Sequence, residues 1–255
     1  MTPTIDLAGQ VALVTGGTKG LGRAIARTLA DAGVRVFVCA RNAPAVPMEG
    51  IAFRAADVRD PDAARALIDG IVDEAGRIDS LVNNAGGSPA VAAAEASPRF
   101  SEAIVRLNLL APLYLAQAAH PHMAEHGGGS IVNIASVSAI RPSPGTAAYG
   151  AAKAGLLNLT QSLAQEWGPQ GIRVNAIIAG LMATETAEAT YGDAAAQAAV
   201  GRSMPLQRMG TGDDIAGAVL WLCSPLAAWV SGARINVDGG GERPYFLDLV
   251  NGGQA

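Results

Sequence analysis

The sequence predicts an α/β fold in which a single domain is built on a doubly wound parallel sheet of seven strands. Short runs rich in Val, Ile and Leu alternate along the chain with longer alanine-rich segments of helical character, which is the pattern of βαβ units. The first apolar run leads through a glycine-rich turn directly into a helical segment. Hydrophobic residues make up 50% of the 255 residues, which is enough for one large core.

The elements follow from this alternation in chain order. Strands are expected at residues 11–14, 34–39, 51–54, 80–82, 130–134, 173–178 and 234–237. The longest helices are expected near residues 98–125 and 147–167, and both are rich in small apolar residues. We predict one domain over residues 1–255, ending in a tail at 241–255.

Composition and charge exclude several classes of protein. A net charge of -4 and a pI near 5.4 argue against a nucleic-acid surface, which normally carries a basic excess. Two cysteines cannot make a disulfide framework, and the N-terminus lacks the pattern of a signal peptide. The longest apolar runs are too short to cross a membrane. We therefore expect a soluble cytoplasmic protein that binds a small molecule.

The glycine-rich turn predicts a phosphate-binding site. Glycines allow the backbone to approach a phosphate closely, and the N-terminus of the following helix offers free N–H groups and partial positive charge. The spacing here is G-x-x-x-G-x-G, which departs from the commoner G-x-G-x-x-G. The alternative is a turn chosen for packing alone. Candidate ligand contacts are Gly16, Thr18, Lys19, Gly20, Leu21 and Gly22.

The end of the second strand indicates which dinucleotide would bind. An NAD-specific protein usually has an acid there for the ribose 2′-hydroxyl, but no acid stands between Asp31 and Glu49. Arg41 is present instead, and Lys19 is expected to approach the same pocket. The sequence therefore predicts NADP(H) rather than NAD(H). The alternative is that Arg41 is a solvated loop residue.

Tyr149 and Lys153 are four residues apart, so a helix would bring a phenol and an ammonium side by side. A neighbouring cation stabilises phenolate and lowers the pKa of a tyrosine, which would equip Tyr149 for acid–base catalysis. The alternative is an ordinary surface contact on a helix.

Taken together, the motifs identify a resemblance to the short-chain dehydrogenase/reductases. The resemblance rests on the spaced glycine turn, on Asn-Asn-Ala-Gly at 83–86, on Ser136 and on Tyr-Gly-Ala-Ala-Lys at 149–153. It covers nearly the whole chain and is closest to the compact, single-domain, Rossmann-like subgroup. It implies an oxidoreductase that acts on a small carbonyl or alcohol substrate.

The resemblance implies a catalytic tetrad of Asn108, Ser136, Tyr149 and Lys153. Tyr149 would donate a proton to a carbonyl oxygen or take it from an alcohol, and Lys153 would keep its pKa low and bind the nicotinamide ribose. Ser136 would hold the substrate oxygen; Ser138 is the less favoured candidate for that role. Asn108 would sit in a bent helix that holds a proton-relay water.

The resemblance also implies further contacts with the cofactor, at Asp57, Val58, Asn84, Ala85, Gly86, Gly180, Met182 and Thr184. Asp57 would bind the adenine amino group, with a helix N-cap as its alternative role. The turn after the sixth strand departs from the family, because Ala179 stands where relatives usually have proline. Without proline the turn is expected to be looser.

Other features are read more simply. Residues 184–203 correspond to a mobile lid in relatives.

His120, His122 and His126 are interpreted as a solvated helix end without a metal, with Pro121 interrupting the turn. A homotetramer, or a homodimer, is expected through the two long helices.

The predicted function is that of an NADPH-dependent carbonyl reductase, reversible as a secondary-alcohol dehydrogenase. Its substrate stays open, and 3-oxoacyl thioesters are among the classes considered. The alternative function is a catalytically idle NADP-binding sensor or scaffold.

Overall fold

The fold is the predicted one: seven parallel strands in a single sheet, in the order β3-β2-β1-β4-β5-β6-β7. The computed structural model describes residues 5–185 and 187–244. The strands are β1 (Val11–Thr15), β2 (Arg35–Ala40), β3 (Ile51–Ala55), β4 (Ser80–Asn83), β5 (Gly129–Ser136), β6 (Ile172–Ala179) and β7 (Arg234–Val237). Each observed strand overlaps the segment that the apolar runs predict.

Eight α-helices lie within the described part of the chain. They are α1 (Gly20–Asp31), α2 (Pro61–Ala75), α3 (Pro98–Val105), α4 (Ala111–Glu125), α5 (Ala147–Trp167), α6 (Glu188–Tyr191), α7 (Ala194–Ser203) and α8 (Gly212–Cys223). No helix in this part of the chain is long and apolar enough to cross a membrane.

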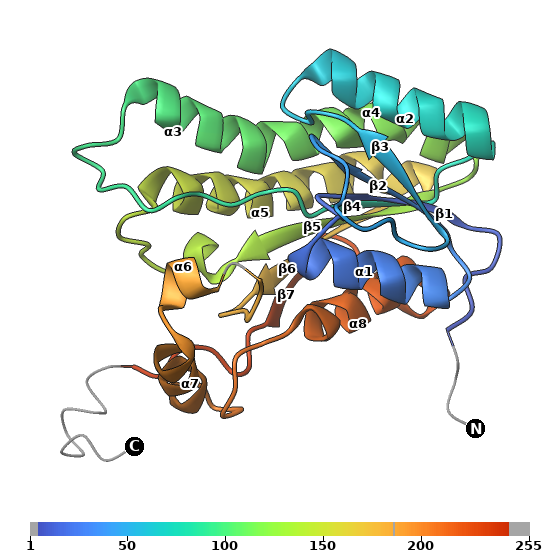
Figure 1. The fold of residues 1–255 in the computed structure, drawn as a ribbon. Coiled ribbons are helices and arrows are strands. Elements are labelled where there is room, and N and C mark those ends of the chain that lie inside the picture. The colour runs from blue at the N-terminus through green and yellow to red at the C-terminus, as the bar shows by residue number, and fades with distance from the viewer. Residues whose placement is uncertain (1–4, 186, 245–255) are drawn as a thin grey trace.

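The helices cover both faces of the sheet, as Figure 1 shows, with α1 and α8 on one side and α2 to α5 on the other. Alternate side chains of a strand point to opposite faces, so Ala12 and Val14 of β1 pack with α1 and α8. Val11 and Leu13 pack instead with α2 and α4. The two apolar layers therefore hold β1 rigidly between them.

The long helical segment at 98–125 contains a distortion. Residues 106–110 form a turn of π-helix between α3 and α4, with Asn108 at its centre. This turn is the bend that the sequence predicts at Asn108. Pro121, by contrast, lies inside α4 and does not end it, so the expected interruption at Pro121 is wrong.

The strand order creates the site. The chain runs outward from β1 to β3 and then crosses back to β4 on the other side of β1. Loops that leave the carboxyl ends of β1 and β4 therefore diverge, and a crevice opens between them.

Candidate active site

A cleft of about 870 Å³ lies at the carboxyl ends of the strands. It brings together nearly all of the residues that the sequence singles out. Predicted residues that line it are Gly16, Lys19, Gly20, Leu21, Gly22, Arg41, Asp57, Val58, Asn84, Ala85, Gly86, Ser136, Tyr149, Lys153, Gly180, Met182 and Thr184. Thr18 and Asn108 are not among the lining residues.

The glycine turn is packed too closely for a side chain at Gly22. A Cβ on Gly22 would lie 2.4 Å from the carbonyl oxygen of Gly16 and 2.5 Å from Nδ2 of Asn84. Asn84 donates from that nitrogen to the carbonyl oxygen of Thr15 at 2.8 Å. The end of β4 is thus fastened to the turn after β1, and the N-terminus of α1 opens on the cleft.

An internal carboxylate occupies the N-terminus of α1. The backbone N–H of Gly20 donates to Oε1 of Glu185 at 3.3 Å. The pKa of Glu185 is lowered by a hydrogen bond from its own backbone, by that from Gly20 and by the charges of Arg23 and Lys19. This end of α1 therefore stabilises an anion, and it fits the pyrophosphate of a dinucleotide. No pattern in the sequence pointed to Glu185.

The edge of the cleft beside β2 and β3 holds a cluster of charges. Arg59 forms a bidentate pair with Asp57, with Nε 2.9 Å from Oδ1 and Nη2 2.5 Å from Oδ2. These hydrogen bonds, and more weakly the charge of Arg41, hold the pKa of Asp57 below its usual value. Asp60, not Asp57, is the N-cap of α2, so the alternative role for Asp57 is wrong. Arg59 was missed, although an arginine two residues after Asp57 was an available signal.

Ser136 and Tyr149 meet at the opposite end of the cleft. Ser136 is the last residue of β5, and its Oγ accepts a hydrogen bond from the backbone N–H of Ser138 at 3.2 Å. A hydrogen bond also joins the side chains of Ser136 and Tyr149. Tyr149 lies in the first turn of α5. The two hydroxyl groups can therefore hold the same substrate oxygen.

Lys153 is buried below Tyr149. Its Nζ lies 5.8 Å from the centre of the Tyr149 ring and donates to the carbonyl oxygen of Ile134 at 2.7 Å. Burial lowers the pKa of Lys153 to about 8. Its side chain is therefore held rigidly in place by β5.

The pKa of Tyr149 is raised, whereas the sequence predicts that Lys153 lowers it. Burial raises it, the hydrogen bond with Ser136 opposes the rise, and Tyr191 adds to it. The lowering expected from Lys153 is not found, because desolvation of the phenol dominates and the ammonium is directed at Ile134. At neutral pH the phenol holds its proton.

Asn108 supports the site from behind. Its Oδ1 accepts from the backbone N–H of Gly87 at 2.9 Å, and its Nδ2 donates to the carbonyl oxygens of Gly87 and Ile104 at 3.0 and 2.9 Å. A Cβ on Gly86 would lie 2.7 Å from that Oδ1 and 3.3 Å from Nζ of Lys153. Asn108 thus positions the loop after β4 beside Lys153.

The turn after β6 is held by backbone contacts that the sequence did not reveal. Ala183 donates to the carbonyl oxygen of Gly210 at 2.8 Å, and Gly210 donates to that of Leu181 at 2.9 Å. A Cβ on Gly180 would lie 2.6 Å from Cα of Asp238. These contacts position the turn although Ala179 has replaced the proline.

The histidines do not converge. His122 contacts Asp69 at 3.0 Å, whereas the ring of His120 packs at a tilt against that of Trp167, with centroids 4.7 Å apart. No group of three or more potential metal ligands occurs among residues 5–185 and 187–244.

In the expected lid, α6 and α7 are separated by a short turn. Most of the predicted tail, residues 245–255, lies outside the described residues.

The sheet, the crevice at its switch point and the Ser–Tyr–Lys group define a nucleotide-dependent oxidoreductase of the α/β class. A family model described as enoyl-(acyl carrier protein) reductase matches residues 16–242. The chain belongs to the short-chain dehydrogenase/reductase family.

Individual relatives agree with this assignment. The chain is 34% identical to dehydrogenase/reductase SDR family member 4 of Caenorhabditis elegans, with 91% of this chain and 95% of that protein covered. It is 35% identical to 2-dehydro-3-deoxy-D-gluconate 5-dehydrogenase of Escherichia coli, covering 92% and 96%. The ligand-free structure of aldohexose dehydrogenase from Thermoplasma acidophilum superposes with a TM-score of 0.88 at 33% identity, covering 93% and 96%. The chain is accordingly an oxidoreductase of alcohol or carbonyl groups that uses a nicotinamide cofactor.

Proposed function

We propose that this protein is an NADPH-dependent carbonyl reductase, reversible as a secondary-alcohol dehydrogenase. The observation that carries the proposal is the meeting of the Ser136 and Tyr149 hydroxyls at one end of the cleft, above the buried Lys153. A bound nicotinamide would supply the hydride chemistry. The residues of the chain would supply the positioning and the proton.

The proton step assigns a role to each side chain. Ser136 and Tyr149 hold the carbonyl oxygen, and Tyr149 gives its proton to that oxygen as negative charge develops there. Because burial keeps the phenol protonated, the site is prepared for reduction at neutral pH. Lys153 would hold the nicotinamide ribose, and Asn108 keeps the loop after β4 in place beside Lys153.

Substitution of Tyr149 tests the mechanism. Tyr149→Phe is expected to abolish reduction while NADPH still binds, because only the transferable proton is removed. Tyr114→Phe is the matched control, since Tyr114 packs in the core and is not among the lining residues of the cleft. Turnover by Tyr149→Phe at the rate of the control would refute the mechanism. Binding without oxidation of NADPH across keto-esters, 3-oxoacyl thioesters, cyclic ketones and quinones would instead favour a sensor or scaffold.

The preference for NADP(H) is supported by three cations at one edge of the cleft, Lys19, Arg41 and Arg59. A 2′-phosphate there would meet positive charge, although Asp57 is paired with Arg59. Arg41→Asp is expected to shift preference towards NADH. Arg27→Asp makes the same charge change on an exposed part of α1 away from the cleft. An unchanged ratio of NADPH to NADH efficiency in Arg41→Asp would remove Arg41 from the explanation.

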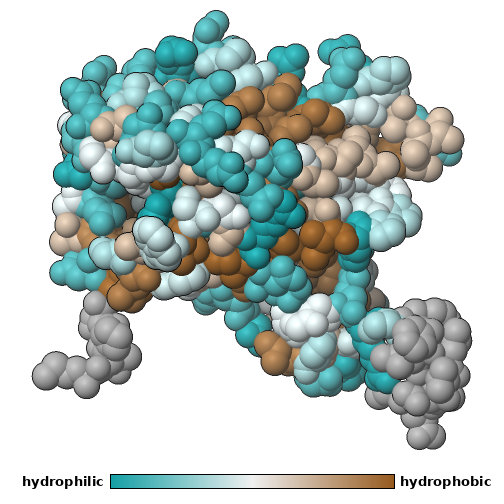
Figure 2. Space-filling model, turned by 180° about the vertical axis from the view of Figure 1, so that it is seen from behind, coloured by the Kyte–Doolittle hydropathy of each residue, from teal (hydrophilic) through white to brown (hydrophobic). Residues whose placement is uncertain are grey.

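We also propose that copies of the chain associate, as a homotetramer or a homodimer. Figure 2 shows apolar colour at the top centre and right of the molecule, the side on which α3 to α5 lie in Figure 1, and further apolar patches across its middle and lower part. Sedimentation or light scattering would measure the mass, and a monomer at micromolar concentration would contradict the proposal. The cytoplasmic location stays a prediction from the sequence, to be tested by cell fractionation.

A further inference from the structure

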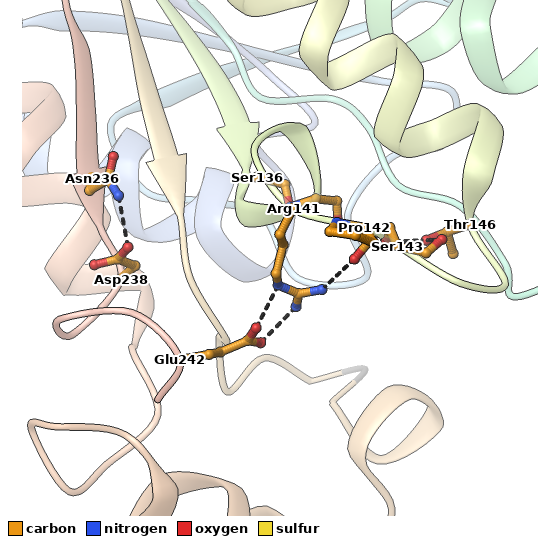
Figure 3. A network of polar contacts seen from close by, with 9 residues as sticks. Ser136, Arg141, Pro142, Ser143, Thr146, Asn236, Asp238 and Glu242 are labelled. Carbon is orange, nitrogen blue, oxygen red and sulfur yellow. Dashed lines mark hydrogen bonds and ion pairs between the residues drawn. The ribbon is translucent and has the colours of Figure 1, made fainter. Parts of the chain in front are cut away.

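A cation stands at the rim of the cleft on the side of the catalytic hydroxyls. Arg141 follows Ser136 by five residues and lines the same cleft as Ser136 and Tyr149. Figure 3 shows its guanidinium directed from the loop after β5 towards Glu242, which follows β7. The other described cations of the cleft are Lys19, Arg41 and Arg59 at the nucleotide end, and Lys153, which is bonded to Ile134. Arg141 is therefore the cation that a substrate would meet.

Glu242 faces two of the three guanidinium nitrogens of Arg141. Nη2 of Arg141 donates to Oε1 of Glu242 at 2.7 Å, and Nη1 donates to the carbonyl oxygen of Pro142 at 3.0 Å. Nε lies 2.6 Å from Oε2 of Glu242, but its N–H is not aligned for a hydrogen bond. Both side chains are more than a third exposed. An ion pair of this kind is worth only about 0.2–1 kcal/mol.

The charges of Arg141 and Glu242 shift the pKa of Tyr191, which lines the same cleft. Burial raises the pKa of Tyr191, while a backbone hydrogen bond at Met182 and the charge of Arg141 lower it, and Glu242 raises it. Tyr191 in turn raises the pKa of Tyr149. Arg141 and Glu242 therefore lie within electrostatic reach of Tyr191, which is itself a neighbour of Tyr149.

The segment that carries Glu242 follows a run of three glycines. Gly239, Gly240 and Gly241 precede it, with φ of 67°, 96° and 79°. Glycine adopts positive and negative φ about equally readily, so this stretch can take other backbone conformations once its hydrogen bonds with Leu206 and Asp238 open. Since the pair itself is weak, another carboxylate can replace Glu242 at Arg141 by pivoting this segment outward.

We propose that Arg141 binds a carboxylate of the substrate, and that Glu242 is the internal carboxylate which that group replaces. The guanidinium fork is matched to a planar carboxylate in a bidentate arrangement. The substrate class is then the oxo acids, with hydroxy acids in the reverse direction. This inference rests on the proposed carbonyl reductase and narrows its substrate.

Matched pairs of charged and neutral substrates test whether a substrate carboxylate replaces Glu242 at Arg141. Acetoacetate, 4-oxopentanoate and 5-oxohexanoate would each be compared with its methyl ester, in reduction with NADPH and in calorimetric binding in the presence of NADP+. Arg141→Gln is expected to weaken the acid of preferred length by about 10- to 100-fold, the range for loss of a paired charge contact, and to leave its ester within about 2-fold. Glu242→Gln is expected to strengthen the same acid by about 2- to 5-fold, because no internal carboxylate competes.

Glu74→Gln is the matched control, because Glu74 also pairs with an exposed arginine, Arg35, but does not line the cleft. It is expected to leave acids and esters unchanged. Parallel changes for acid and ester in Arg141→Gln and Glu242→Gln would overturn the inference, because they would indicate that the ion pair only joins the two segments of the chain. Failure of every acid to bind would also overturn it. If acids bind with the predicted pattern but nothing is reduced, the inference stands and the proposed function is wrong.

Discussion

Lys153 is the buried charge whose removal has the most readily measured consequence. Its side chain is 3% exposed, and burial lowers its pKa from 10.5 to about 8. Between these two values the unfolded chain binds a proton at this lysine and the folded chain does not. Stability therefore rises with pH across this window, because the unfolded state holds more protons.

The magnitude follows from the two pKa values. Going from pH 7 to pH 10, Lys153 contributes an increase of about 2 to 3 kcal/mol to the free energy of unfolding. Lys153→Met removes this contribution. The free energy of unfolding of the wild type minus that of the variant must therefore rise by that amount between pH 7 and pH 10. Catalysis is expected to be lost as well, since the group proposed to hold the nicotinamide ribose is gone.

Urea denaturation at a series of pH values from 7 to 10 measures the difference. The only other lysine of the chain is Lys19, which is exposed, so Lys19→Met provides the control for losing a lysine without losing a buried charge. A difference between wild type and Lys153→Met that changes by less than about 1 kcal/mol over this range would refute the reasoning, because a full desolvation effect requires more.

Three further predictions follow from particular contacts. Gly22→Ala is expected to weaken dinucleotide binding by at least about 10-fold in a fluorescence titration, because its Cβ would lie 2.4 Å from the carbonyl oxygen of Gly16; unchanged affinity would contradict the close packing. Glu185→Gln is expected to tighten NADPH binding by about 2- to 5-fold, since an anion leaves the N-terminus of α1, and weaker binding would contradict competition. Asn108→Leu is expected to lower the free energy of unfolding by about 1–3 kcal/mol, because it removes the buried hydrogen bond to the carbonyl oxygen of Ile104 and the two part-buried hydrogen bonds with Gly87; a loss below about 0.5 kcal/mol in denaturation would contradict that role.

Much of the fold was predictable because its signals are local. The alternation of apolar runs and alanine-rich segments is a property of neighbouring residues, and it indicated all seven strands. The glycine turn and the spacing of Tyr149 and Lys153 are likewise short-range patterns. Asn108 was predictable only through the family, because one asparagine in a helix carries no signal of its own.

Other residues of the site could not be predicted because their partners are distant in sequence. Glu185 reaches Gly20 across 165 positions, and Glu242 reaches Arg141 across 101. Neither pairing leaves a periodic trace in the chain. The pKa of Tyr149 was misjudged for a related reason: the spacing to Lys153 is visible in the sequence, whereas the burial that raises the pKa is not.

The sequence by itself determined the sheet, the glycine-rich turn after the first strand and the helical spacing of Tyr149 and Lys153, because these depend on residue type and local spacing. Only the tertiary structure decided the electrostatics of the site. Packing of the helices on the sheet buried Tyr149 and Lys153, set Arg59 on Asp57, brought Glu185 into the cleft and placed Glu242 on Arg141. Desolvation and contacts between distant segments arise only when the chain is folded, which is why the charge state of the site had to be taken from the structure.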